Sequence, residues 1–119
     1  MNKLINVFKI LSDETRLRII ILLAQEEFCV CQLSGILDIS QPNISKHLAK
    51  LRDVGFVSVE RKEKFIFYRL MKENLILSSI AHDILSNIHE FPQLGIDQKR
   101  MIDKEQYLNQ CCDKNIFKV

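Results

Sequence analysis

The apolar residues of this chain change their spacing at Gly55, and that change constrains the fold more than any other feature. From Ile44 to Val54 apolar residues recur at intervals of three and four, which is typical of a helix with one buried face. From Phe56 to Leu70 they recur at every second residue, which is typical of β-strands. The sequence therefore predicts a helix followed directly by a β-hairpin.

The predicted helix has recognisable start and stop residues. Ser40 is a good N-cap, and Pro42 lies in the first turn, where a backbone N–H has no partner within the helix. Gly55 ends the helix because glycine adopts the left-handed conformation at little cost. A shorter helix, near residues 31–37, precedes it, and residues 38–39 form the turn between them. Two helices joined by a tight turn indicate a helix-turn-helix.

The outer face of the second helix is polar and basic. Glutamine, asparagine, serine and lysine at the start of an exposed helix can reach base edges and phosphates in a DNA major groove. The candidate DNA-contacting residues there are Gln41, Asn43, Ser45, Lys46 and Lys50. An ordinary surface helix has the same pattern, so this face alone does not decide between the two interpretations.

The predicted hairpin has a charged tip, which decides in favour of DNA. Residues 61–64 read Arg-Lys-Glu-Lys, so Arg61, Lys62 and Lys64 are candidates for contacts to the DNA backbone. A helix-turn-helix followed at once by a hairpin with a basic tip is a winged helix. We therefore predict a mainly α fold with a β-hairpin wing, in preference to a purely structural β-ribbon.

The rest of the chain is predicted to be helical. One helix covers residues 3–11, and Ser12 caps a second helix whose apolar run, residues 19–23, lies at the centre of the domain. A long helix over residues 72–91 carries an apolar stripe that we expect to pack against a second copy, giving a homodimer through the N-terminal and long C-terminal helices. Pro92 and Gly95 are expected to break the chain before an amphipathic segment over residues 97–113.

These patterns divide the chain into a winged-helix and dimerisation domain, residues 1–91, and a helical C-terminal extension, residues 92–119. The net charge is +2, so affinity for a polyanion must come from local basic patches. No stretch approaches the ~18 apolar residues of a membrane span, and the N-terminus lacks the layout of a signal peptide. We therefore expect a cytoplasmic protein without a membrane partner, in which the cysteines are reduced thiols.

The four cysteines form two close pairs. Cys29 and Cys31 precede the first helix of the helix-turn-helix, and on an extended stretch residues two apart share one face. Thiolates at a helix N-terminus have a lowered pKa, which favours ligation of soft metals. Cys111 and Cys112 are adjacent near the C-terminus. Packing as small apolar residues is the alternative, but two tight pairs indicate a soft-metal or metalloid site.

The chain resembles the ArsR/SmtB family of metal-sensing winged-helix repressors, most closely its arsenic-responsive members. The resemblance covers residues 3–90 and rests on LSDETRLRIIILL, FCVCQLS, SQPNISKHLAKLRDVGFV and the hairpin that ends in FYRL. It implies a dimeric repressor that leaves its operator when an ion binds. It also implies that the helix residues named above contact the major groove and that the hairpin is the wing.

One position departs from the arsenic-sensing pattern of the family. The third cysteine of that pattern falls on Ser34, a poor ligand for a soft ion. Arsenite bound by thiolates requires three sulfurs in a pyramid, so we expect a composite site of Cys29 and Cys31 with Cys111 or Cys112. The long-helix zinc motif of the family is not matched by His82, Asp83 and His89.

The sequence therefore predicts a repressor that is released from operator DNA by arsenite. Within the same fold, cadmium, lead or zinc bound by four thiolates, or a thiol-redox response, are the alternatives. An enzyme with a cysteine nucleophile is disfavoured, because the spacing is C-x-C rather than C-x-x-C and no phosphate-binding glycine loop is present.

Overall fold

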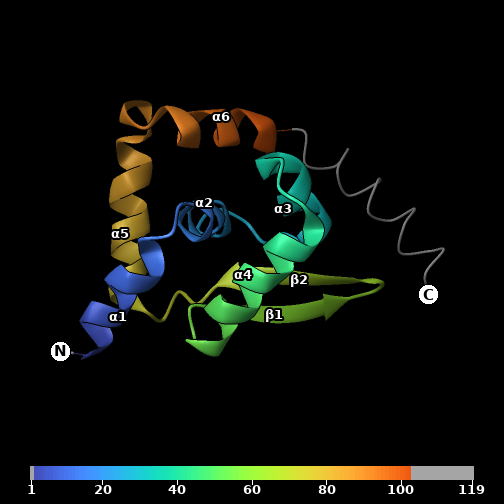
Figure 1. Ribbon diagram of the computed structural model, residues 1–119, viewed down its shortest axis with the longest axis horizontal. Coiled ribbons are helices and arrows are strands. Elements are labelled where there is room, and N and C mark those ends of the chain that lie inside the picture. The colour runs from blue at the N-terminus through green and yellow to red at the C-terminus, as the bar shows by residue number, and fades with distance from the viewer. Residues whose placement is uncertain (1, 103–119) are drawn as a thin grey trace.

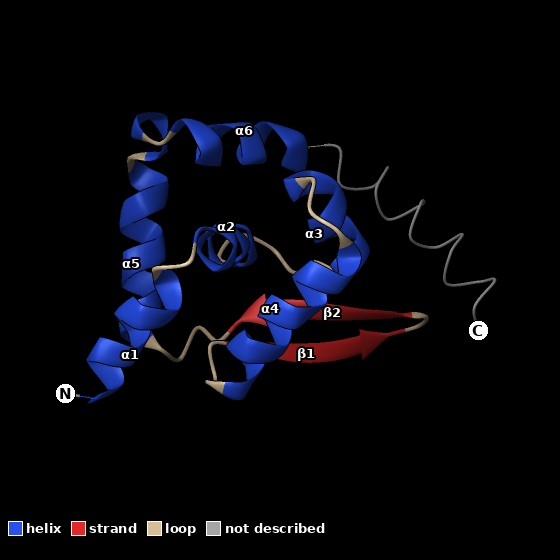
Figure 2. Cartoon of the chain, viewed as in Figure 1, coloured by secondary structure: helices blue, strands red, loops and turns tan. Residues whose placement is uncertain are grey.

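The structure, a computed structural model, describes residues 2–102 as a set of helices with a two-stranded antiparallel hairpin at one side (Figures 1 and 2). In chain order the elements are α1 (Asn2–Leu11), α2 (Glu14–Leu23), α3 (Val30–Leu37), α4 (Gln41–Asp53), β1 (Val57–Lys62), β2 (Phe65–Leu70), α5 (Leu75–Ser86), the 3₁₀ helix η1 (Ile88–Glu90) and α6 (Pro92–Met101). The predicted winged helix-turn-helix is confirmed.

Helix α2 is the centre of the fold. It is seen end-on in Figure 1, with the other helices and the hairpin arranged around it. Its run from Ile19 to Leu23 is 0–2% exposed, and α2 packs against α1, α4, α5, α6 and β2. A helix that is apolar on all sides is stable only when it is buried on all sides, as the sequence predicted.

The helix-turn-helix has the predicted boundaries. Asp38, in the left-handed conformation (φ 58°), ends α3, and the Ser34 hydroxyl donates a hydrogen bond to the carbonyl of Ile39 in the turn. The Ser40 hydroxyl accepts a hydrogen bond from the backbone N–H of Asn43 at the start of α4. Capping at both ends of the turn fixes the direction in which α4 leaves it.

Strands β1 and β2 pair in a continuous register from Val57↔Leu70 to Lys62↔Phe65. The turn is shorter than predicted, because Arg61 and Lys62 belong to β1. Glu63 adopts a positive φ of 55°, as two-residue hairpin turns require. The charged tip therefore consists of the turn itself and the last two residues of β1.

The N-cap of α2 corrects the sequence analysis by one residue. Asp13, not Ser12, has the extended backbone of an N-cap, and its carboxylate accepts a hydrogen bond of 3.0 Å from the N–H of Arg16. Ser12 instead donates its hydroxyl proton to the carbonyl of Lys9 at the end of α1. A carboxylate at this position is further stabilised by the helix dipole.

The predicted long helix over residues 72–91 is wrong in extent. Asn74 caps α5, whose last helical residue is Ser86, and η1 follows as a separate short helix. His82 lies in α5 and His89 in η1, so they do not share one helix face. Pro92 does not break the chain but begins α6, where a missing N–H costs nothing, and Gly95 lies inside that helix.

The apolar stripe of α5 is covered in part by its own chain, and its packing against a second copy stays a prediction. Leu77 and Ala81 are 0% and 1% exposed, and the partly buried Ile80, Ile84, Leu85 and Ile88 pack against the same chain's core. The exposed apolar surface lies elsewhere, on α1 and in the first turn of α5. Its residues are Leu4, Ile5, Phe8, Leu75 and Ile76, and further exposed apolar side chains are scattered over the hairpin and the segment from Phe91 to Ile102.

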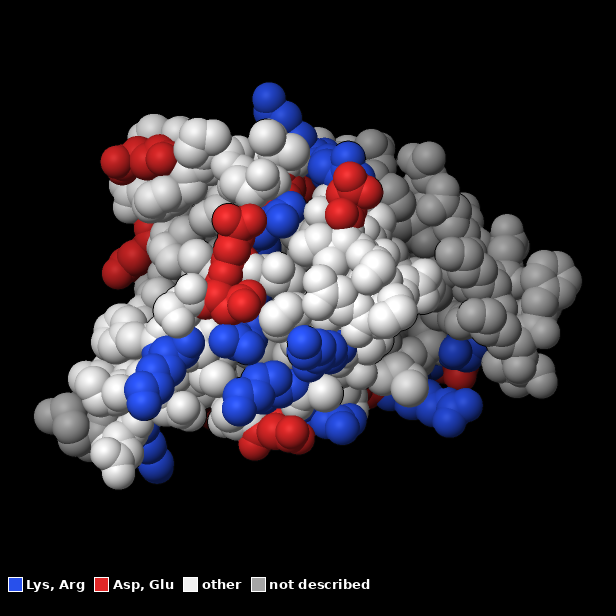
Figure 3. All heavy atoms as spheres, in the orientation of Figure 1, with Lys and Arg blue, Asp and Glu red and all other residues white. Residues whose placement is uncertain are grey.

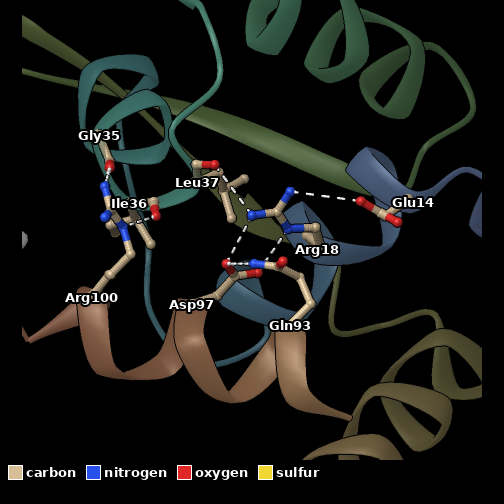
Figure 4. A network of polar contacts seen from close by, with 8 residues as sticks. All are labelled: Glu14, Arg18, Gly35, Ile36, Leu37, Gln93, Asp97 and Arg100. Atoms are coloured by element: carbon tan, nitrogen blue, oxygen red, sulfur yellow. Dashed lines mark hydrogen bonds and ion pairs between the residues drawn. The ribbon is translucent and has the colours of Figure 1, made fainter.

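Helix α6 is attached to α2 and α3 by a polar network (Figure 4). Arg18 of α2 forms two hydrogen bonds with Asp97 of α6 and one with the carbonyl of Leu37. Arg100 of α6 donates to the carbonyls of Gly35 and Ile36. Because the last carbonyls of a helix have no partner within it, the two arginines cap the C-terminal end of α3.

Candidate nucleic-acid interface and cysteine site

The outward face of α4 is available to a large ligand. Ile44, Leu48 and Leu51 are fully buried and hold the opposite face of α4 against the core. Of the predicted DNA-contacting residues on this helix, Gln41 is half-buried and the others are exposed, namely Asn43, Ser45, Lys46 and Lys50. The polar residues thus occupy one face, at the positions expected for groove contacts.

Basic side chains gather around this face. Figure 3 shows Lys and Arg side chains along the lower part of the molecule, over α4 and towards the hairpin tip. Lys46, Lys50 and Arg52 are exposed on α4, and Arg61 and Lys64 are exposed at the tip. A chain with a net charge of only +2 therefore concentrates positive charge where helix and hairpin lie side by side.

Lys62 differs from the other basic residues of the tip. Its ammonium group lies 2.6 Å from both carboxylate oxygens of Glu27 and 5.8 Å from the ring centroid of Phe67. The hydrogen bond with Glu27 raises the pKa of Lys62. Lys62 is thus attached to the segment before α3, whereas Arg61 and Lys64 extend from the hairpin.

Cys29 and Cys31 lie where the sequence predicted, at the junction between an extended segment and α3. Phe28 forms a β-bridge with Tyr68, and Cys29 is the N-cap residue of α3. Both cysteines are buried, 3% and 7% exposed, and pack against Phe65 and Phe67 of β2. The pair is therefore covered by the hairpin.

The predicted lowering of the thiol pKa is wrong for Cys29, a free thiol. Burial raises the pKa of Cys29 because removal from water disfavours the thiolate. Backbone N–H groups of Gln32 and Cys31, at the start of α3, lower it by a smaller amount. The helix N-terminus acts in the predicted direction, but desolvation is the larger effect.

Sequence reasoning missed three residues around the cysteine pair. Gln32 is 2% exposed, and its side-chain oxygen accepts a hydrogen bond of 3.0 Å from the backbone N–H of Cys29. A glutamine three residues after an N-cap is a recognisable capping pattern. Phe65 and Phe67 could be suspected from the alternation of β2, but their contact with the cysteines depends on the tertiary fold.

The remaining predicted ligands, Cys111 and Cys112, lie outside the described residues. Within residues 2–102, no group of three or more histidine, cysteine, aspartate or glutamate side chains is placed to hold a metal ion. The expectation of reduced thiols is wrong for Cys31, which is disulfide-bonded, whereas Cys29 is a free thiol. Once Cys31 is reduced, Cys29 and Cys31 supply two sulfurs at one place, so a three-sulfur site needs a further donor. In the same part of the chain, no helix is both long and apolar enough to cross a bilayer.

Comparison with known proteins gives the same picture of the fold. A model of the bacterial regulatory protein family arsR matches residues 13–59. The chain is 47% identical to the arsenic resistance transcriptional regulator ArsR2 of Pseudomonas putida over 81 aligned residues. The alignment covers 67% of this chain and 68% of that protein.

Two other relatives match over a shorter segment. The arsenic resistance transcriptional regulator ArsR1 of Pseudomonas putida is 50% identical over 56% of this chain and 53% of its own length. The arsenical resistance operon repressor of Escherichia coli is 52% identical over 56% of this chain and 57% of its own length. The chain thus spans little more than half the length of these two relatives.

Solved structures share the architecture. The transcriptional repressor BigR from Xylella fastidiosa superposes with a TM-score of 0.65 at 33% identity, over 71% of this chain and 85% of that one. The homodimeric winged helix-turn-helix domain of Mb0332 from Mycobacterium bovis superposes with a TM-score of 0.63 at 25% identity. This superposition covers 75% of this chain and 81% of that one.

Proposed function

This chain belongs to the ArsR family of bacterial regulatory proteins, and we propose on that premise that it is a transcriptional repressor released from operator DNA by trivalent arsenic. The family consists of regulators and not of enzymes. The observation that carries the proposal is the pairing of two features within one small fold. An exposed polar and basic face on α4 lies beside a basic hairpin tip, and a buried cysteine pair begins the helix before α4.

To bind DNA, α4 lies in the major groove. Asn43, Ser45 and Lys46 in its first turns, together with Gln41, reach base edges and phosphates, and Lys50 contacts the backbone one turn later. Arg61 and Lys64 at the hairpin tip follow the adjacent backbone. Lys62 contributes only to the extent that DNA competes with Glu27 for its ammonium group.

The proposed DNA-binding unit is a homodimer. Four large apolar side chains, on α1 and at the start of α5, are 47–75% exposed. They are Ile5, Phe8, Leu75 and Ile76. An exposed apolar surface of this kind is suited to a two-fold interface with a second copy, and the structurally similar domain of Mb0332 is homodimeric. Two copies of α4 would then read two half-sites of a palindromic operator.

The inducer is bound by cysteine thiolates. Trivalent arsenic forms three bonds to sulfur, and in the reduced protein the buried Cys29 and Cys31 fit that chemistry as two of the three donors. Cys111 or Cys112 is proposed as the third. Cadmium, lead or zinc would be favoured instead if all four thiolates ligated together, and a thiol-redox response remains the second alternative.

Release of DNA follows from thermodynamic linkage. An effector that binds the free conformation more tightly than the DNA-bound one weakens DNA binding by the same factor. The contribution of this chain is to place the effector ligands at the N-terminal end of α3, while the C-terminal end of α3 leads through the turn into α4. A change at Cys29 is therefore transmitted to elements that contact DNA.

The DNA-binding proposal is tested with an operator obtained by selection from random duplex DNA. The affinity of the reduced protein is measured by fluorescence anisotropy for the wild type, Lys46→Ala and Asn43→Ala. Lys99→Ala is the matched control, because Lys99 is exposed on α6, away from α4 (Figure 1).

Lys46→Ala should weaken binding and reduce the dependence of log K on log salt by about one, since one phosphate contact is lost. Asn43→Ala should lower the preference for the selected operator over unrelated DNA, by about tenfold, since a base contact is lost. Lys99→Ala should match the wild type. Equal effects of Lys46→Ala and Lys99→Ala would contradict the assignment of α4.

A further inference from the structure

Strand β2 of the hairpin is bound to the segment that carries the cysteine pair. Phe28, the residue before Cys29, exchanges two backbone hydrogen bonds with Tyr68, of 3.1 and 2.8 Å. The Lys62–Glu27 ion pair connects the same segment to the end of β1. The hairpin therefore cannot move as a unit without moving, or separating from, residues 27–29.

Two aromatic side chains cover the cysteine pair. Phe65 and Phe67, two residues apart on β2, pack against Cys29 and Cys31, and their ring centroids are 6.1 Å apart with the planes tilted by 57°. Phe67 also carries the Lys62 ammonium over its ring. The aromatic pair thus joins the cysteines, the strand and the charged end of the hairpin in one packed cluster.

Helix α3, which carries the cysteine pair at its start, is held more firmly than the strand that covers the pair. Leu33 and Ile36 of α3 are 0% exposed in the main core, and Arg18 and Arg100 bind the last carbonyls of the helix (Figure 4). Phe65 and Phe67, in contrast, are only partly buried. In the reduced protein we therefore expect a ligand at the sulfurs to displace β2 rather than α3, because packed interiors have little free space.

We infer that Phe65 and Phe67 are positioning residues that connect the cysteine pair to the hairpin, so that ligation of Cys29 and Cys31 displaces β2 and with it the basic tip. This inference deepens the proposed function and rests on it. By linkage the reverse also holds: DNA that fixes the hairpin tip holds the aromatic cover over the cysteine pair. Reorientation of α4 is not required for release.

The first test measures thiol accessibility in a full-length Cys111→Ser/Cys112→Ser background. Alkylation of Cys29 and Cys31 by iodoacetamide is followed by mass spectrometry, with and without the selected operator. Operator DNA should slow alkylation by about fivefold or more. Phe67→Ala should raise the rate without DNA and remove the protection by DNA. Phe67→Leu, which keeps an apolar cover, should be intermediate.

Ile66→Ala is the matched control, since Ile66 is 49% exposed and its side chain points to the other face of the same strand. It should behave like the parent background. The inference would be overturned if DNA did not slow alkylation in the parent background. It would also be overturned if DNA slowed alkylation of Phe67→Ala as much as that of the parent. Circular dichroism of each variant verifies that the fold is retained.

The second test uses the reduced protein with its natural cysteines, and arsenite is the probe. Arsenite affinity is measured from thiolate–arsenic absorbance, and operator affinity is measured with and without arsenite. Phe67→Ala should bind arsenite within about threefold of the wild type, while the ratio of its operator affinities without and with arsenite falls from about fivefold or more in the wild type to about one. An unchanged ratio in Phe67→Ala would overturn the inference.

The two proposals fail in different ways. A wild type that binds the operator but does not respond to arsenite contradicts the proposed inducer, and the alkylation experiment still decides on the connection through Phe67. A wild type that responds to arsenite, with Phe67→Ala responding equally, contradicts the connection and leaves the proposed inducer standing.

Discussion

Arg18 and Asp97, which are 79 residues apart in the chain, form a bidentate pair at the junction of α2, α3 and α6 (Figure 4). Nε and Nη2 of Arg18 each lie 2.9 Å from a carboxylate oxygen, and the two side chains are only 11% and 3% exposed. Gln93 donates a further hydrogen bond to Asp97. This pair attaches α6 to the helices that lead into α4.

Asp97→Asn should destabilise the protein by about 3 kcal/mol, because it leaves the charge of Arg18 buried without its partner. The free energy of unfolding is measured by urea denaturation. Glu14→Gln is the matched control: Glu14 also pairs with Arg18, but at 3.9 Å and with its side chain 81% exposed. It should cost less than about 0.5 kcal/mol. Equal losses for the two variants would contradict the structural importance of the pair.

Gly55→Ala should destabilise the protein by about 1 kcal/mol or more, because Gly55 has a φ of +81°. An added Cβ meets no atom within 4 Å there, so the cost comes from the backbone alone. Gly95→Ala offers the contrast. Gly95 lies within α6 with equal space for a Cβ, so this variant should gain about 0.5 kcal/mol. Thermal unfolding of both variants tests this; the same sign of change in both would be inconsistent with it.

Asp13→Ala should cost about 1 kcal/mol at neutral pH through loss of the α2 cap. The hydrogen bond from the Arg16 N–H, with a smaller effect of His47, holds the pKa of Asp13 below its usual value. Its stabilisation is therefore present above the unfolded-state pKa and is lost as the pH falls through the folded-state pKa. The difference between Asp13→Ala and wild type should shrink from neutral pH to about pH 2. A constant difference would rule out the titrating cap.

Cys29 should react slowly with alkylating reagents at neutral pH, because burial raises the pKa of its thiol. In a Cys31→Ser/Cys111→Ser/Cys112→Ser background, the pH midpoint of iodoacetamide alkylation should lie above that of free cysteine. Since the folded state favours the protonated thiol, folding stability from this group is present below the unfolded-state pKa and falls as the pH rises above it. A midpoint below that of free cysteine would show that the helix N-terminus outweighs burial.

Those parts of the fold that depend on local chemistry could be predicted from the sequence. Ser40, Pro42 and Gly55 act within one or two turns of their own positions, so the limits of α4 followed from residue type. The burial of residues 19–23 followed from an apolar run too wide for a surface helix. The change of period after Gly55 identified the hairpin.

Other features depended on tertiary contacts. The apolar stripe of α5 was expected to face a second copy, and two of its residues, Leu77 and Ala81, are covered by the same chain; periodicity cannot distinguish the two situations. The pairing of Lys62 with Glu27, 35 residues away, has no local signature. The raised pKa of Cys29 also required knowledge of burial, which the spacing of the cysteines does not contain.

The most direct test of the account is the operator affinity of the reduced protein with and without arsenite, compared between the wild type and Cys29→Ser. We expect arsenite to weaken operator binding of the wild type by at least about fivefold. Cys29→Ser should bind the operator as tightly as the wild type and should not respond to arsenite. A Cys29→Ser protein that arsenite releases as readily as the wild type would contradict the placement of the effector site at the start of α3.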